Sequence, residues 1–512
     1  MLRTVRLLLP LLLLLLSSRN APAEPVDTHA IDTLVERTRA YWNVPGVAVA
    51  IVRDGEVIYL KGHGVRSVVS DEKVTPDTLF PIASCTKSFT TTAMALLVDE
   101  GKMSWDDPPR KYVPYFHLSD PFVDREVTLR DLVTHRTGLG GHDLLWYRSP
   151  CSQEDIIRRV GRLPLDKPFR TTFQYQSTMF TVAGFAVAKA SGMSWESFVQ
   201  KRLFDKLGMN AARFTTTAIA QVADRAQPHR LNDDNKPEST ELYPMEVPEP
   251  AGSIQANARD LSKWLRFQLG DGTVDGTPKS ERLLSARNLK EMHTPQIMLP
   301  LDPLDRDMFP DTNQMSYGMG WVIQDHCGQR ILQHAGAIDG FRCHFTLVPK
   351  GRLGIVLLCN LHQTRMNIAL SNALLGLLLK LPPRDRDWNA IVFAAERKNA
   401  REVEAKERAK RARRHVNAPP SRELGAYTGA YEHPAYGTVR ITLKGETLVW
   451  QWNRFSAPLK HYHYDTFTLP IEFMGTPHVV FTLDARSTVA RMKVLGTMDV
   501  EFQRSKTKAP ER

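Results

Sequence analysis

The sequence lacks the short motifs that mark several large enzyme classes. It contains no GxSxG nucleophile elbow, no HExxH metal motif, no P-loop and no GxGxxG dinucleotide loop. Glycine (30 residues) and proline (33 residues) are near average, while 42% of residues are hydrophobic and 24% charged. These values exclude collagen-like, low-complexity and mainly disordered chains. A chain of 512 residues can therefore bury a large core, divided among up to about three domains.

Cysteine is scarce and is not arranged in pairs. The five cysteines, none in CxxC spacing, are Cys85, Cys151, Cys327, Cys343 and Cys359. The odd number leaves at least one thiol free, and both buried thiols and up to two disulfides stay open. The sequon Asn-x-Ser/Thr is absent, so we expect no N-glycosylation. His461 and His463 could share a strand face, but no third ligand accompanies them, so we predict no metal and no cofactor.

Long hydrophobic runs are confined to the N-terminus. Two arginines precede a leucine-rich run over residues 7–16, and small residues stand at Ala21 and Ala23. This pattern predicts a signal peptide over residues 1–23 and a secreted, extracellular protein, or a periplasmic one in a bacterium. The run is too short to cross a hydrocarbon core of about 30 Å, and the sequence has no other stretch of about 18 or more apolar residues, so no stable membrane span is expected.

The surplus of positive charge is concentrated in two stretches. The net charge is +11. Residues 396–415 hold nine Lys or Arg and four Glu, and residues 504–512 hold four Lys or Arg and one Glu. Because the rest of the folded chain is nearly neutral, no nucleic-acid surface is indicated. A solvated linker and tail explain the charge, and binding of an acidic extracellular polymer is the alternative.

Hydrophobic periodicity predicts a mixed α/β (α+β) unit over residues 24–380. Residues 29–41 and 84–100 have the spacing of amphipathic helices, and residues 46–64 that of a β-hairpin. Strand patterns return only at residues 318–360. We therefore expect one antiparallel sheet built from both ends of the unit, flanked by helices, with a helical region inserted between its strands.

The pattern changes class after residue 380. Residues 381–420 form a charged linker that begins near a Pro-Pro pair, and residues 421–505 contain short alternating strands separated by turn residues. We predict a small all-β, barrel-like domain over residues 421–505, followed by a basic tail over residues 506–512.

The pattern Ser-x-x-Lys occurs three times, and context separates the copies. Ser70 lies in a polar turn and Ser505 in the basic tail, whereas Ser84 opens the helix that follows the apolar segment TLFPIA. The spacing i, i+3 places Ser84 and Lys87 on one helix face. A serine nucleophile needs a neighbouring base, and a lysine serves only if its pKa is lowered. The alternative is a helix cap at Ser84 beside a solvated lysine.

Four segments, in order, resemble the serine β-lactamase and penicillin-binding-protein superfamily, in particular its class C-like branch of esterases and peptidases. The segments read FPIASCTKSFTTTAMALLVDEGKMSWDDP, TLRDLVTHRTGLGG, EPAGSIQANARDLSKWLRFQL and HAGAIDGFRCHFTLVPKGRLGIVLLCN, and the resemblance covers about residues 28–376. The resemblance implies a β-lactamase/transpeptidase-like fold with Ser84 as the nucleophile, and the C-terminal domain resembles the lipocalin-like appendage of some members.

The resemblance also implies a proton path. Tyr175 matches the tyrosine of the family motif Tyr-x-Asn, which moves a proton between nucleophile, lysine and leaving group, but Ser177 stands where the family has asparagine. Because a serine hydroxyl donates one hydrogen bond and an amide two, Ser177 would change how substrate is positioned. His135 lies in a structural segment of the family, so we expect it to pack rather than react.

A third motif would build the oxyanion hole. His334-Ala335-Gly336 matches the family pattern Lys-Thr-Gly or His-x-Gly, so His334 would face the cleft and act on the tyrosine or the substrate. The N–H groups of Ser84 and Ala337 would stabilise the oxyanion, and Gly336 would let the strand approach the substrate. Cys85, rotated by about 100° from the nucleophile, is expected to face the core.

Together these features favour a secreted serine hydrolase, a peptidase or an esterase, that acts on a small-molecule or peptide substrate through an acyl-enzyme. The alternative is a secreted extracellular-matrix structural or binding protein that keeps the fold with little or no activity. The altered asparagine and the basic segments favour the alternative, and retention of the four family residues at positions 84, 87, 175 and 334 favours the enzyme. Substrate identity, stereochemistry, disulfide pairing and oligomeric state stay open.

Overall fold

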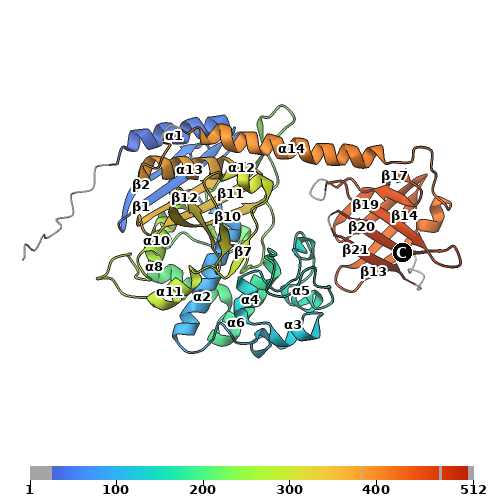
Figure 1. The fold of residues 1–512 in the computed structure, drawn as a ribbon, viewed down its shortest axis with the longest axis horizontal. Helices are drawn as coiled ribbons and strands as arrows, with labels where there is room; N and C mark the ends of the chain where they lie inside the picture. Colours follow the sequence, from blue (N-terminus) through green and yellow to red (C-terminus); the bar gives the residue numbers. More distant parts are fainter. Residues whose placement is uncertain (1–25, 384–385, 472–474, 497, 506–512) are drawn as a thin grey trace, which may run out of the picture.

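The computed structural model describes residues 26–383, 386–471, 475–496 and 498–505, so the predicted signal peptide and the basic tail lie outside the described residues. The described chain forms a mixed α/β unit and an all-β unit, joined by the long helix α14 (Trp388–Ala412) (Figure 1). The first contains an eight-stranded antiparallel sheet and the second a nine-stranded one. The predicted fold class is confirmed.

The large sheet is assembled from both ends of the first unit, as predicted. In spatial order its strands are β2 (Glu56–Gly64), β1 (Gly46–Arg53), β12 (Leu353–Cys359), β11 (Phe341–Val348), β10 (Gln329–Ile338), β9 (Val322–His326), β8 (Met315–Tyr317) and β7 (Ile297–Leu299). The hairpin β1–β2 joins the late strands because β1 pairs antiparallel with β12, where Val49 lies opposite Leu357. This one pairing closes more than 300 residues of chain, which includes the inserted helices.

Helices cover both faces of the sheet (Figure 1). One face packs against α1 (Thr28–Tyr41) and α13 (Met366–Leu379), and the other against α10 (Ala258–Leu269). Side chains alternate along a strand. Val47 and Val49 therefore join the hydrophobic core on the side of α1 and α13, and Ala48 and Ala50 join the core on the side of α10. A strand buried on both faces reads as a continuous apolar run, and β1 has such a run.

The inserted region is helical and surrounds α2 (Thr86–Asp99) and α6 (Ser177–Ser191). Its remaining helices are short: α3 (Pro121–Glu126), α4 (Leu129–Val133), α5 (Gln153–Val160), α7 (Trp195–Val199), α8 (Asp205–Leu207), α9 (Thr216–Ile219), α11 (Ala286–Met292) and α12 (Pro303–Met308), with a π-helical turn over Gln200–Phe204. The 3₁₀ turns are η1 (Ala83–Cys85), η2 (Pro109–Lys111) and η3 (Asp143–Leu145). Two small ribbons pair β3 (Phe80–Pro81) with β6 (Gln255–Ala256) and β4 (His229–Leu231) with β5 (Pro237–Ser239).

Helix α2 differs from the amphipathic helix that its sequence predicts. All residues from Thr86 to Leu97 are buried, so the helix runs through the interior. Its polar side chains bond to carbonyls instead of water: Thr90 Oγ1 donates to Pro250 O at 2.7 Å, and Thr91 Oγ1 donates to Met319 O at 3.1 Å. A hydrophobic pattern counts threonine as polar, although a buried hydroxyl that finds an acceptor costs little.

The C-terminal unit is a nearly closed barrel-like sheet. In spatial order its strands are β16 (Phe455–Pro458), β15 (Thr447–Trp452), β14 (Gly437–Lys444), β13 (Gly429–His433), β21 (Val500–Arg504), β20 (Val489–Leu495), β19 (His478–Leu483), β18 (Thr466–Thr468) and β17 (Lys460–His463), and η5 (Leu424–Tyr427) precedes them. The edge strands β16 and β17 are separated by Leu459 alone, so the sheet must curl until its edges meet. Aromatic side chains such as Trp450, Tyr431 and Phe502 fill the interior and are fully buried.

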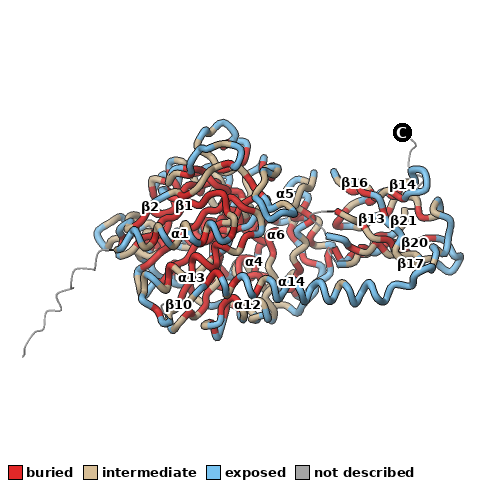
Figure 2. The backbone as a smooth tube through the Cα atoms, turned by 90° about the horizontal axis from the view of Figure 1, so that it is seen from above, coloured by how far each residue is buried: buried red, intermediate tan, exposed pale blue. Residues whose placement is uncertain are grey.

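The predicted charged linker is largely the helix α14. Its first turns pack against α13 through Trp388, Val392 and Ala395, and the rest is exposed (Figure 2). At the far end Tyr462 Oη donates to Lys410 O at 3.1 Å. The exposed stretch explains why the sequence pattern indicated a solvated linker there.

A second contact joins the two units. The turn between β13 and β14 meets α5 and the loop before η3: Arg159 donates to Ala435 O at 3.3 Å, and Arg162 donates to Pro434 O at 3.2 Å. His142 Nδ1 lies 2.9 Å from Tyr436 Oη. The C-terminal unit thus contacts the rest of the chain at two places: the end of α14, and the turn between β13 and β14.

All five cysteines are free thiols. Among the described helices, none combines the length and the apolar character needed to cross a bilayer.

Candidate active site

Ser84 lies in the 3₁₀ turn η1, directly before α2. The preceding residue, Ala83, has a φ of 45°, in the left-handed region that costs an alanine about 1–2 kcal/mol. Lys87 lies in the first turn of α2, and its Nζ is 3.2 Å from Ser84 Oγ. The spacing i, i+3 therefore produces the contact that the sequence predicted. Cys85 points into the core, as expected, and its thiol donates to His334 O at 3.2 Å.

Lys87 is completely buried among aromatic rings and carbonyls. Its Nζ donates to Ala251 O at 2.9 Å and lies 4.8 Å from the centre of the Tyr175 ring and 5.4 Å from that of Phe180. Burial lowers the pKa of Lys87 to about 8, and the charges of Asp143 and Glu249 oppose that shift. A lysine with this pKa is partly neutral near physiological pH, so it can accept a proton from Ser84.

Glu249 fixes the segment that holds Lys87. Its carboxylate accepts from Thr181 Oγ1 at 2.7 Å, from Gln153 Nε2 at 2.8 Å and from Ala251 N at 3.2 Å. Burial raises the pKa of Glu249, although these bonds and Lys87 act in the other direction. The carboxylate therefore shapes the turn from which the Ala251 carbonyl reaches Lys87.

Tyr175 completes a contact group with Ser84 and Lys87. The Ser84 hydroxyl acts to lower the pKa of Tyr175, yet burial dominates and raises it. The side chain is therefore a neutral phenol, which can donate a proton but is poorly suited to be the initial base. The His135 ring packs against it with centroids 4.4 Å apart and is fully buried, so the predicted packing role of His135 is confirmed.

The His334 ring makes no hydrogen bond to Ser84, Lys87 or Tyr175 in the described part of the chain. Its Nδ1 is 2.8 Å from Ala335 O and its Nε2 is 3.1 Å from Tyr317 Oη. Because a carbonyl only accepts, Nδ1 carries the proton and Nε2 accepts from Tyr317. Burial, with the nearby Lys87 charge, lowers the pKa of His334 to about 3, so the ring is neutral. The centres of the His334 and Tyr175 rings lie 6.4 Å apart.

Strand β10 passes directly over the nucleophile turn. A Cβ added at Gly336 would lie 2.0 Å from Ile82 O and 3.3 Å from Ser84 N, so only glycine fits there. The next residue, Ala337, is exposed. In the described structure β10 pairs with β9 only from Gln329 to Gln333, so beyond that point its edge is open towards Ser84.

Ser177 is the first residue of α6 and is buried. The described structure shows no hydrogen bond from it to Ser84, Lys87 or Tyr175. The neighbouring Gln176 instead caps α6, since its Oε1 accepts from Thr178 N at 3.0 Å. The structure thus brings Ser84, Lys87, Tyr175 and Gly336 together and leaves Ser177 outside their hydrogen bonds.

Comparisons with known proteins agree with this geometry. The beta-lactamase family profile matches residues 31–377, more than half of the chain. This chain belongs to the beta-lactamase family. A second profile, a domain of unknown function (DUF3471), matches residues 413–509.

Curated relatives of this beta-lactamase family member include hydrolases. The unguisins hydrolase ungD' of Aspergillus campestris is 29% identical over 458 residues, which cover 83% of this chain and 80% of that protein. The unguisins hydrolase ungD of Aspergillus violaceofuscus is 27% identical and covers 86% and 82%. Protein flp of Staphylococcus aureus is 24% identical over 65% of this chain and 63% of its own length.

Solved structures share the fold along nearly the whole chain. The octameric penicillin-binding protein homologue from Pyrococcus abyssi has a TM-score of 0.62 at 21% identity and covers 93% of this chain and 100% of that one. SurE has a TM-score of 0.56 at 20% identity and covers 93% and 99%. At these identities the likeness shows the fold alone.

Sequence reasoning missed three residues around the site of this beta-lactamase family member. Asp143, Glu249 and Tyr317 act on Lys87 or His334 by charge or hydrogen bond. Asp143 follows the segment THRTGLGG by two residues, and Glu249 is the first residue of the segment EPAGSIQANARDLSKWLRFQL. That proximity is the one signal that could have revealed them.

Proposed function

We propose that this protein is a secreted serine hydrolase that cleaves an amide or ester bond through an acyl-enzyme on Ser84. The observation that carries the proposal is the 3.2 Å contact between Ser84 Oγ and a fully buried Lys87 whose pKa is lowered to about 8. A capping serine beside a solvated lysine would have neither feature, so the contact favours a nucleophile paired with its base.

In the acylation step, neutral Lys87 takes the Ser84 hydroxyl proton while Oγ forms a bond to the substrate carbonyl carbon. The carbonyl π electrons move to its oxygen, and the N–H groups of Ser84 and Ala337 stabilise that oxyanion. Loss of one such donor typically costs about 10²–10³-fold in rate. The close approach of Gly336 to Ser84 N supports this placement of the two donors.

Collapse of the tetrahedral intermediate requires a proton on the leaving group. The Tyr175 phenol donates it as the bond from carbon to the amine or alkoxide breaks, and the Lys87 ammonium returns a proton to the phenolate. A water molecule then attacks the acyl-enzyme, neutral Lys87 takes its proton, and Lys87 returns that proton to Ser84 Oγ as the bond from Oγ to the acyl carbon breaks. The raised pKa keeps the Tyr175 phenol protonated at the start of the reaction, which supports Lys87 rather than Tyr175 as the first base.

We infer a peptidase or esterase rather than a β-lactamase. Ser177 replaces the asparagine of the family motif and makes no hydrogen bond to the described catalytic group. The relatives named unguisins hydrolases support hydrolysis as the reaction class. We also propose that residues 1–23 are removed on secretion, and a mature N-terminus at Glu24 in intact-mass analysis of the exported protein would test this.

Covalent labelling tests the proposal. The purified protein is treated with a fluorophosphonate and, separately, with a fluorescent penicillin, and the adduct is mapped by mass spectrometry. We expect a fluorophosphonate adduct on Ser84 that Ser84→Ala abolishes. Ser70→Ala, at another Ser-x-x-Lys, is the matched control and should keep full labelling. No adduct with either probe between pH 6 and 9, on folded protein, would contradict the proposal.

A second candidate function is binding of an acidic extracellular polymer. It is favoured by the exposed basic stretch of α14 that leads into the C-terminal unit. Retention on an immobilised acidic polysaccharide would be salt-sensitive and equal for the native protein and Ser84→Ala, because the site of binding is far from the nucleophile. Labelling of Ser84 would show that such binding accompanies catalysis rather than replacing it.

A further inference from the structure

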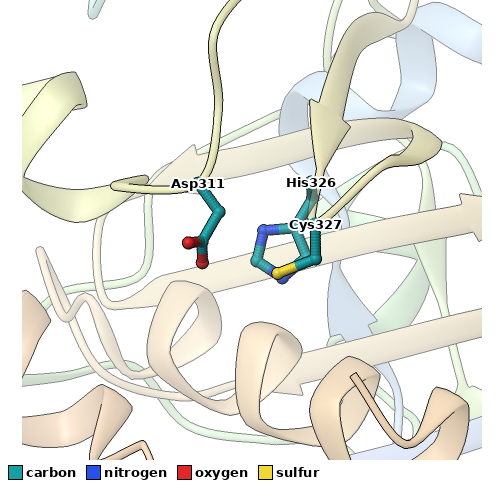
Figure 3. Close-up of side chains that lie close together, drawn as sticks. All are labelled: Asp311, His326 and Cys327. Carbon is teal, nitrogen blue, oxygen red and sulfur yellow. The ribbon is translucent and has the colours of Figure 1, made fainter. Parts of the chain in front are cut away.

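A group of mixed potential metal ligands lies away from the active site, in the described part of the chain. Asp311 lies in the loop after α12, and His326 and Cys327 lie at the end of β9 and in the turn to β10. One ligand atom from each residue lies within 4.8 Å of the other two. Figure 3 shows the three side chains side by side, with a ring nitrogen of His326 on the side of Asp311.

The imidazole of His326 is the group that points to a ligand. Its side chain is buried, with 1% exposed, and Nδ1 has no hydrogen-bond partner among the described residues. A buried polar nitrogen without a partner typically costs about 1–3 kcal/mol. The ring packs against Trp388 with centroids 5.6 Å apart, which fixes its orientation towards the group.

We propose that Asp311, His326 and Cys327 bind a divalent transition-metal ion of the zinc type. One oxygen, one imidazole nitrogen and one sulfur suit Zn²⁺ or Co²⁺, whereas Ca²⁺ and Mg²⁺ require oxygen ligands. Tetrahedral bonds of about 2.0–2.3 Å place ligand atoms about 3.3–3.8 Å apart, so small side-chain rotations complete the site. The Cys327 thiol loses its proton to solvent on binding.

The fourth position is open to water or to a backbone carbonyl. The Cys327 thiol donates to Pro382 O at 3.6 Å, so this carbonyl lies within reach of the group. In a structural zinc site the ion has four ligands, and three protein side chains with one further oxygen satisfy that number.

Arg386 is compatible with this site. Its Nη1 pairs with Asp311 Oδ2 and leaves Oδ1 for the ion. The guanidinium also lies 5.0 Å from the centre of the Trp388 ring, so it is fixed on that ring beside the carboxylate. Metal-bound carboxylates commonly carry an outer hydrogen bond of this kind, which orients them. The alternative is that the group is an Asp311–Arg386 ion pair and nothing more.

A metal here would connect three segments: the loop after α12, the turn from β9 to β10, and through Trp388 the first turn of α14. That helix carries the C-terminal unit. The site is therefore structural, and its occupancy would stiffen the attachment of α14 to the first unit without contact with Ser84.

Cobalt titration of the full-length, reduced and chelator-treated protein tests the site. We expect one equivalent of Co²⁺ to give a thiolate-to-cobalt charge-transfer band, and Zn²⁺ to displace it and raise the Tm. Cys327→Ser, which is nearly isosteric, should abolish the band and the Tm rise. His326→Gln should weaken binding at least about tenfold. The matched control Cys151→Ser, at a partly buried cysteine elsewhere, should behave as the native protein.

Two results would overturn the proposal. One is absence of the charge-transfer band in the native protein at several equivalents of Co²⁺, which would leave the Asp311–Arg386 ion pair as the role of the group. The other is an unchanged band in Cys327→Ser, which would place the sulfur ligand elsewhere. If His326→Gln fails to fold, the Cys327→Ser and Cys151→Ser pair still decides the matter.

Discussion

His142 and Tyr436 join the two units beside the active site: His142 Nδ1 lies 2.9 Å from Tyr436 Oη. His142 directly precedes Asp143, whose charge raises the pKa of Lys87. The tyrosine is 3% exposed, so its hydroxyl is shielded from water where it meets the loop. The C-terminal unit therefore contacts the loop that borders the proton-transfer group.

Removal of this hydroxyl should affect substrate binding more than chemistry. Tyr436→Phe loses one hydrogen bond, worth about 1 kcal/mol, so we expect KM to rise roughly fivefold while kcat changes less than twofold. Steady-state kinetics on an ester reporter would measure both constants. Tyr464→Phe, at an exposed tyrosine of the same unit, is the control and should leave both unchanged. An equal fall of kcat in the two variants would contradict a positioning role for Tyr436.

The pH dependence of kcat/KM should report Lys87. The lysine must be neutral to accept the Ser84 proton, so activity should be low below its pKa and rise as pH passes through about 8. The negative charge of Asp143 raises that pKa, so Asp143→Asn should move the rising limb to lower pH.

The matched control for this shift is Asp233→Asn, at an exposed residue of a distant loop, which should keep the native profile. A limb that moves to higher pH in Asp143→Asn would show that another group controls it.

Gly336 should tolerate no side chain. In Gly336→Ala the new Cβ would lie 2.0 Å from Ile82 O, so β10 or the nucleophile turn must move. We expect kcat/KM to fall about 10²–10³-fold, the loss that follows from one displaced oxyanion donor, together with a lower Tm. Gly376→Ala in α13, where a Cβ meets nothing within 4 Å, should keep activity and raise stability by up to about 1 kcal/mol. Native-like kcat/KM in Gly336→Ala would refute the close approach.

Two buried tyrosines should respond differently to loss of the hydroxyl. Tyr175→Phe removes the proton donor, so we expect kcat to fall about 10²–10⁴-fold with a small change in Tm. Tyr317→Phe leaves His334 Nε2 unpaired, which should lower stability by about 1–3 kcal/mol with a smaller loss of kcat. Thermal denaturation and steady-state kinetics on both variants distinguish a proton donor from a residue that stabilises the fold. A larger loss of kcat in Tyr317→Phe than in Tyr175→Phe would contradict this assignment.

Much of the fold follows from the sequence because the central strands carry unmistakable apolar runs. The runs at residues 46–52 and 353–359 predicted a sheet from both ends of the unit, and β1 does pair with β12. Strands β13, β16 and β21 were not predicted, since each has only four or five residues. The buried course of α2 was also missed, because sequence alone does not show which carbonyls its threonines reach.

The candidate site also contains residues that the sequence predicts and residues that it does not. The contact of Ser84 with Lys87 follows from helix geometry, because i and i+3 share a face. Asp143 and Tyr317 are far from Ser84 in sequence and act through space, so no spacing rule finds them. The group of Asp311, His326 and Cys327 was invisible for the same reason, since a loop and a hairpin turn bring it together.

The length of helix α14 determines both the distance and the rotation between its two attachment points. The helix is fixed to α13 near Trp388 and to the C-terminal unit at Lys410, and between these points Glu396 pairs with Arg365 at 3.1 Å and Lys398 with Asp307 at 2.7 Å. Each residue of an α-helix adds about 1.5 Å and about 100° of rotation. Substitutions on its exposed surface should therefore be tolerated, whereas one inserted residue would swing Tyr436 out of register with His142. The charged residues on the exposed surface of α14 can therefore vary during evolution. The length of α14 can change only together with the turn between β13 and β14, which carries Tyr436.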